Sequence, residues 1–264
     1  MIFSHKCPII LLGNFTGEGC ELHMRNNMKK QIRKSVVVML LIAMVCPSIT
    51  VEAKQLTKQD AKVVVIDPGC QRKANTKKEP IGPGAFKTTE QSPAGEIGYD
   101  TGYPEYELNL QISLKLQNIL KEQGYKVVLT RTENDVDISN SGRAMIANTS
   151  EADIFVVINT GESDVPSVVC QSEDNPYTYG NYTDSRLLSD AILGSVAQTT
   201  ESKMDDVKEN DEKTVINWSQ VPTAIVEVGS LSNEQDEKNL VTDIYQQKMA
   251  QGIANGIDSY FTQK

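Results

Sequence analysis

Histidine is nearly absent from this sequence of 264 residues, because His5 and His23 are the only two and both lie close to the N-terminus. Tryptophan occurs once, at Trp218. The chain also has no low-complexity segment and no repeat with a period of about 20 to 50 residues, which excludes solenoids and propellers. The scarcity of histidine matters most, since imidazole is the commonest metal ligand and a frequent general base.

The sequence has no surplus of basic residues. It contains 26 Lys and Arg and 35 Asp and Glu, and the formal net charge is −9. Phosphate backbones and anionic membrane surfaces are held mainly by clustered positive charge. We therefore expect no nucleic-acid partner, and contact with a membrane only through an N-terminal segment. The apolar share of 39% is sufficient for a packed core. The length predicts one sizeable globular domain or at most two small ones.

A long hydrophobic run is absent too, and the apolar stretch Val36–Cys46 is too short to cross a membrane comfortably as a helix. It follows four basic residues between Lys29 and Lys34 and precedes Val51-Glu52-Ala53, which is the pattern of a signal peptide and its cleavage site. We predict a signal peptide at 28–53, a mature domain at 54–264, and secretion to the cell wall or the extracellular space. An uncleaved N-terminal anchor is the alternative.

Residues 1–27 form an N-terminal extension that does not fit the signal-peptide pattern, and translation is expected to start at Met24 or Met28 instead. On that expectation the mature protein contains no histidine. Its cysteines are Cys70 and Cys170, which are too few for a disulfide scaffold, and the sequence leaves open whether they pair.

Apolar runs and helical periodicity alternate along the rest of the chain. Strands are predicted at 62–67, 125–130, 154–158, 167–171 and 223–228, and helices at 104–123, 139–148, 182–199 and 243–261. Alternating strands and helices predict a single α/β domain of three layers, with a mostly parallel or mixed sheet flanked by helices. The segment Gln71–Tyr103 is predicted to be a long loop, and loops of that length often line a site.

Ligands of such sheets bind beyond the carboxyl ends of the strands. Cys70 and Asn159 each follow a predicted strand, and Glu227 lies near the end of the last one. Glu107 lies in the first turn of the helix 104–123, where the helix dipole alone favours a carboxylate. Glu227 stands in an apolar strand, where an unpaired carboxylate is costly, so it is functional, protonated or paired, for example with Arg143.

Five ordered blocks spanning about 62–261 give the sequence a family resemblance. They are VVVIDPGCQ, GYPEYELNLQISLKLQNILKEQGYKVVLTR, SGRAMIAN, ADIFVVIN and VPTAIVEVGSLSN. The sequence resembles the zinc-dependent N-acetylmuramoyl-L-alanine amidases of bacterial cell walls, which are hydrolases acting on peptidoglycan. In that family zinc is held by a His after the first strand, a Glu opening the first helix and a His ending a later strand, and a further Glu is the general base.

Carried over by resemblance, Glu107 stands at the retained zinc-ligand position and Glu227 at the catalytic base. Cys70 and Asn159 replace the two histidines. A thiolate and a carboxylate are competent zinc ligands, but a neutral amide binds zinc weakly. The resemblance therefore implies zinc for the family and predicts that zinc is absent or weakly bound here. Arg131 and the arginine of the third block are expected to fix loops rather than to touch substrate.

Three functions follow from these residues. The first is a secreted family member with impaired catalysis that binds peptidoglycan or a cell-wall or envelope protein. The second is an active amidase that cleaves the muramoyl–L-alanine bond with an atypical metal site. The third is a hydrolase with Cys70 as nucleophile, which is disfavoured because cysteine nucleophiles usually rely on a histidine to lower their pKa.

Overall fold

The computed structural model describes residues 61–264, apart from residues 94, 162, 164, 178–179 and 204. All of them belong to one compact unit, Lys58–Lys264. The predicted N-terminal extension and signal peptide at 1–53 lie outside the described residues. Within the described part, no helix combines the length and the apolar character needed to span a membrane.

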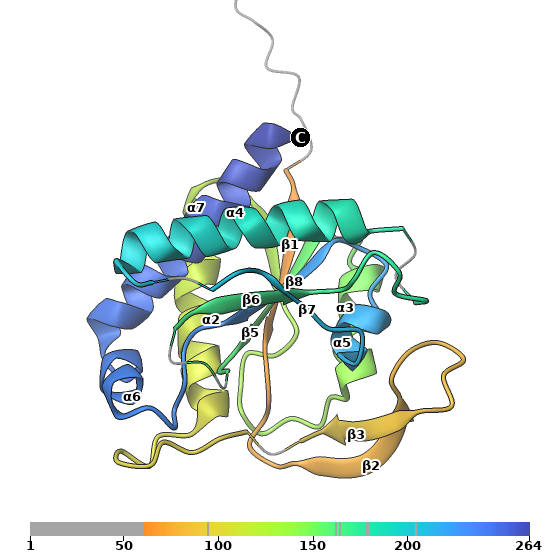
Figure 1. Cartoon of the computed structure of the whole chain (residues 1–264), viewed down its shortest axis with the longest axis horizontal. Coiled ribbons are helices and arrows are strands. Elements are labelled where there is room, and N and C mark those ends of the chain that lie inside the picture. The colour runs from red at the N-terminus through yellow and green to blue at the C-terminus, as the bar shows by residue number, and fades with distance from the viewer. Residues whose placement is uncertain (1–60, 94, 162, 164, 178–179, 204) are drawn as a thin grey trace, which may run out of the picture. The chain divides into compact units, whose positions relative to one another are not determined.

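A mixed sheet of six strands forms the centre of the unit, in the order β4-β1-β5-β8-β6-β7 (Figure 1). The strands are β1 Val63–Pro68, β4 Lys126–Leu129, β5 Ile154–Asn159, β6 Ser167–Cys170, β7 Lys208–Glu209 and β8 Thr223–Glu227. Strands β4, β1, β5 and β8 run parallel, β6 runs antiparallel to β8, and β7 is parallel to β6. The predicted mostly parallel or mixed sheet is confirmed.

Helices cover both faces of this sheet, which confirms the three layers (Figure 1). They are α2 Glu105–Glu122, α3 Asn140–Thr149, α4 Tyr182–Thr200, α5 Thr214–Asn217, α6 Glu234–Leu240 and α7 Asp243–Gln263. Side chains of β1 alternate between the two cores: Val64 and Ile66 join the core beneath α2, α4 and α7, and Val65 joins the core beneath α3 and α5. A strand buried on both faces explains the continuous apolar run in the sequence.

Residues with known capping preferences set the start of α3 and the end of α2, close to the predicted positions. Gly124 follows α2 with φ +93°, a conformation that glycine adopts without strain. The side chain of Ser139 caps α3 by accepting a hydrogen bond from the backbone N–H of Gly142 at 3.1 Å. Such caps depend on residues adjacent in sequence, which is why the sequence identifies them.

The prediction that Gln71–Tyr103 is a loop is wrong for its central part, which forms two strands. Strands β2 (Asn75–Pro80) and β3 (Thr88–Ser92) pair there as an antiparallel hairpin, a second sheet of two strands. Their residues are largely polar and show no strict alternation of buried and exposed positions, so periodicity does not reveal them. The short elements β7, α5 and α6 escape the sequence analysis for a similar reason, because they are too brief for a periodic pattern.

Candidate functional site

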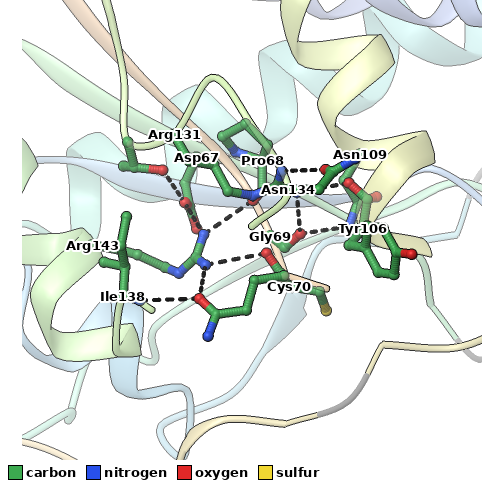
Figure 2. A network of polar contacts seen from close by, with 12 residues as sticks. Asp67, Pro68, Gly69, Cys70, Tyr106, Asn109, Arg131, Asn134, Ile138 and Arg143 are labelled. Carbon is green, nitrogen blue, oxygen red and sulfur yellow. Dashed lines mark hydrogen bonds and ion pairs between the residues drawn. The ribbon is translucent and has the colours of Figure 1, made fainter. Parts of the chain in front are cut away.

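The loop after β1 is held by a buried ion pair (Figure 2). The Arg143 guanidinium on α3 lies 2.7 Å from the Asp67 carboxylate, and both side chains are almost completely buried. Arg143 also donates to the backbone oxygens of Pro68 at 3.0 Å and Cys70 at 3.1 Å. Because both terminal nitrogens of the guanidinium donate, these contacts fix the position and the direction of the loop.

Arg131 fixes the same loop from the other side (Figure 2). It donates to the backbone oxygens of Pro68 at 2.7 Å and Gly69 at 3.1 Å, and also to Tyr106 at 2.7 Å in the first turn of α2. Burial, and then the neighbouring charge of Arg143, lowers the pKa of Arg131 to about 10, which leaves it charged at neutral pH. The predicted loop-fixing role of both arginines is therefore confirmed.

Cys70 closes this loop in a left-handed backbone conformation, with φ +58°. Burial, and then the nearby Glu105 carboxylate, raises the pKa of its thiol well above the usual value. This shift disfavours the thiolate, which is the form of cysteine that acts as a nucleophile.

The carboxylate beside Cys70 is Glu105, not the predicted Glu107. A Cβ placed on Gly95 would lie 3.0 Å from the Glu105 carboxylate and 3.2 Å from the Cys70 Cβ, so these side chains meet at one point. Successive helical residues are rotated by about 100°, so Glu107 points away from Glu105 by about 200°. Burial, and then the charge of Glu107, raises the pKa of Tyr103, so Glu107 lies near that phenol.

Glu105 is buried and its carboxylate accepts three N–H groups. The donors are the backbone N–H of Glu96 at 2.8 Å, the backbone N–H of Thr160 at 3.0 Å and the Asn109 side-chain amide at 3.3 Å. Asn109 also donates to the Gly69 oxygen at 3.2 Å. The carboxylate therefore ties the loop before α2 to the loop after β5.

Asn159 ends β5 in register with Glu227 on β8, so the two side chains emerge on one face. The Asn159 Oδ1 is buried without a hydrogen-bond partner among the described residues. A Cβ on Gly69 would lie only 1.6 Å from that oxygen. Asn159 therefore covers the Gly69 backbone, and no larger residue fits at position 69.

Glu227 does not pair with Arg143, the partner considered from the sequence, because Arg143 forms its ion pair with Asp67. Its carboxylate accepts the Ser167 hydroxyl at 2.6 Å, and the Lys208 ammonium lies 3.8 Å away. The side chain is 14% exposed, so it remains reachable from solvent. Ser167 lies opposite Glu227 on the antiparallel strand β6, which is how the sheet brings them together.

Two cavities lie at this edge of the sheet. The larger has a volume of about 570 Å³ and contains Glu105 and Glu227 in its lining. The smaller has a volume of about 230 Å³ and contains Cys70 and Asn159. Lys213 lines both. The sequence analysis did not identify Glu105 or Lys213. The run PEYEL offers two glutamates at the start of the helix, and no local pattern distinguishes Lys213 from other lysines.

The donor set does not fit a catalytic zinc ion. Burial and Glu105 raise the pKa of the Cys70 thiol, the Asn159 side chain is a neutral amide, and the Glu105 carboxylate already accepts three N–H groups. Across the described part of the chain, no group of three or more His, Cys, Asp or Glu side chains is arranged to hold a metal. Catalytic zinc is normally held by three deprotonated or imidazole ligands.

Comparison with known proteins identifies relatives. A sequence family described as N-acetylmuramoyl-L-alanine amidase matches residues 64–259. The Bacillus subtilis (strain 168) protein described as "Uncharacterized protein YqiI" is 33% identical over 177 residues, covering 64% of this chain and 83% of YqiI. The germination-specific N-acetylmuramoyl-L-alanine amidase of the same organism is 28% identical over 174 residues, covering 61% of this chain and 72% of that enzyme.

A solved structure has the same fold. The crystal structure of the N-acetylmuramyl-L-alanine amidase Ami1 from Mycobacterium smegmatis superimposes with a TM-score of 0.70. The match covers 77% of this chain and 98% of that one, at 20% sequence identity. At this identity the likeness establishes the arrangement of strands and helices.

Proposed function

The chain belongs to the N-acetylmuramoyl-L-alanine amidase family, and we propose on this premise that it is an exported protein that binds peptidoglycan without hydrolysing it. The proposal has three parts: export, binding and loss of hydrolysis. Export rests on the predicted signal peptide at 28–53. Binding rests on the two cavities at the carboxyl edge of the sheet, where ligands of open α/β sheets are bound.

Loss of hydrolysis rests mainly on one observation, the side chains at the two substituted ligand positions: Asn159 is a neutral amide, and Cys70 is a thiol whose pKa is raised by burial and by Glu105. The resemblance carries the family's helix-opening zinc ligand over to Glu107, whereas the carboxylate that lies beside Cys70 is Glu105. In this chain its oxygens accept N–H groups from Glu96, Thr160 and Asn109, so it acts as an internal anchor. These bonds use three of about four lone-pair sites of the carboxylate, so a metal at this position would depend mainly on the side chains at 70 and 159.

The remaining groups do not replace a metal. A free water has a pKa of about 15.7, and a bound zinc ion supplies the shift toward neutrality that amide hydrolysis needs. Glu227 is a carboxylate hydrogen-bonded to Ser167, and a carboxylate alone does not lower the pKa of a water as a bound metal does. The raised pKa of the Cys70 thiol, caused by burial and then by Glu105, also argues against the nucleophile alternative.

The test is to incubate the purified protein with insoluble peptidoglycan, with and without added zinc. We expect the protein to sediment with the polymer, and the release of free amino groups to stay at the background of a Glu227→Gln variant. An active amidase of the family, assayed in parallel, controls for the substrate.

Elemental analysis of the same preparation completes the test, with a zinc content far below one per chain expected. Zinc-dependent release that Glu227→Gln abolishes would refute the loss of hydrolysis and establish the active amidase with an atypical metal site. Protein that stays in the supernatant would refute the binding.

A further inference from the structure

The segment Gly95–Gly102, named the strap, lies in sequence between the hairpin of β2 and β3 and the helix α2, and in space beside α6 (Figure 1). Its first residue lies against the site. A Cβ at Gly95 would be 3.2 Å from the Cβ of Cys70 and 3.0 Å from the Glu105 carboxylate. The strap therefore covers one side of Cys70.

Apolar packing contributes little to holding the strap in place. Ile97 and Tyr99 are 68% and 90% exposed, and Gly98 is the one strap residue that is buried. The residue after the strap, Tyr103, packs against the core and marks its fixed end. A segment with so few buried apolar contacts can open locally while the core stays folded.

Two buried carboxylates hold the strap by hydrogen bonds. Near its start, Glu105 accepts the backbone N–H of Glu96 at 2.8 Å. At its far end, Glu237 on α6 accepts the backbone N–H groups of Asp100 at 3.1 Å and Thr101 at 2.8 Å, and also the Thr101 hydroxyl at 2.6 Å. Among the described residues, the Glu237 side chain accepts hydrogen bonds from the strap alone.

Glu237 and the strap depend on each other. Glu237 is buried, and the neighbouring Lys238 forms its ion pair with Glu234. A buried carboxylate is costly unless donors satisfy it, and the strap supplies those donors. The close approach requires glycine, because a Cβ at Gly98 would lie only 2.1 Å from the Glu237 Oε1. Leu240 of the same helix lies in the core, so Glu237 has a fixed support.

We propose that the strap is a movable cover over Cys70 and that Glu237 is the positioning residue that holds it closed. Opening breaks the three hydrogen bonds to Glu237, gives its carboxylate to water and moves Gly95 away from Cys70. The six-stranded sheet stays folded during this opening. Access to Cys70 is thus controlled from α6, whether or not the chain hydrolyses peptidoglycan.

The experiment measures how fast N-ethylmaleimide, a neutral thiol reagent, labels Cys70 and Cys170 in the purified protein at several low urea concentrations. Peptide mass spectrometry locates the label. Urea promotes an opening in proportion to the surface that it exposes. The rate at Cys70 should therefore be nearly independent of urea, whereas the rate at Cys170, which is buried in the core, should rise steeply.

Glu237→Gln should raise the rate at Cys70 about 10- to 100-fold, because a hydrogen bond to a charged group contributes about that factor. The raised rate should remain nearly independent of urea. Glu234→Gln is the matched control on the same helix, because Glu234 is exposed and contacts Lys238 instead of the strap, and it should leave the rate unchanged.

Gly98→Ala tests the same contact from the strap, and its added methyl group should accelerate labelling of Cys70 as well. If Glu237→Gln fails to fold, Gly98→Ala and the urea dependence in the unaltered protein still decide. A rate at Cys70 that rises with urea as steeply as the rate at Cys170 would overturn the proposal, since labelling would then require global unfolding. An unchanged rate in Glu237→Gln, or an equal acceleration in Glu234→Gln, would overturn it too.

Discussion

Replacing Glu105 by glutamine tests whether this carboxylate is the anchor of the site. Glutamine has the same shape but offers one acceptor oxygen and one NH₂ group. The carboxylate accepts from Glu96 and Thr160 through different oxygens, so in Glu105→Gln one of these backbone N–H groups faces another donor. The remaining contact also loses its charge.

The expected loss follows from those contacts. A hydrogen bond to a charged group contributes about 1.5–3 kcal/mol, and a buried donor without a partner costs about 1–3 kcal/mol. Because the loops at 96 and 160 can relax toward water, we expect a loss of about 2–4 kcal/mol in the free energy of unfolding. For a unit of this size about 1 kcal/mol corresponds to about 2–4 °C, so the melting temperature should fall by about 4–16 °C.

The control lies two residues further along the same helix. Glu107 is half-buried, and within the described residues its carboxylate accepts no hydrogen bond, so Glu107→Gln should change stability by less than about 0.5 kcal/mol. Urea unfolding followed by circular dichroism measures both variants in one buffer. Equal effects of the two substitutions, or a Glu105→Gln protein as stable as the parent, would refute the assignment of Glu105 as the anchor.

Three further predictions concern the loop after β1 and the residues around it. Arg143→Met leaves the buried Asp67 carboxylate without its ion pair and should lower the free energy of unfolding, measured in urea, by about 3–5 kcal/mol. A loss of less than about 1 kcal/mol would show that the pair contributes little. Because burial and Glu105 raise the Cys70 pKa, its thiol should resist alkylation at pH 8 in the native protein and react fully in urea, as judged by intact mass; rapid native labelling would contradict this. Replacing Cys70 and Asn159 together by histidine should bring zinc content close to one per chain, and a further Glu105→Gln should lower it again; unchanged zinc in the triple variant would show that Glu105 is not a ligand there.

Much of the fold follows from sequence because its signals are local or periodic. The strand β1 is a run of β-branched residues, and α2 shows one apolar face between Pro104 and Gly124. The hairpin formed by β2 and β3 lacks such a pattern. Its position is set by contacts across the chain, including the Trp218 indole N–H, which donates to the Pro80 oxygen at 3.0 Å.

The site also divides into residues that local sequence signals identify and residues that only contacts across the chain identify. From sequence alone, the residues Cys70, Asn159 and Glu227 could be assigned to strand ends, because the place where a strand stops is encoded in its own residues and its turn. The choice between Glu105 and Glu107 could not be made that way, since a helix start tolerates a carboxylate at either position. Only the tertiary structure decided it, by placing the N–H groups of two distant loops around one carboxylate.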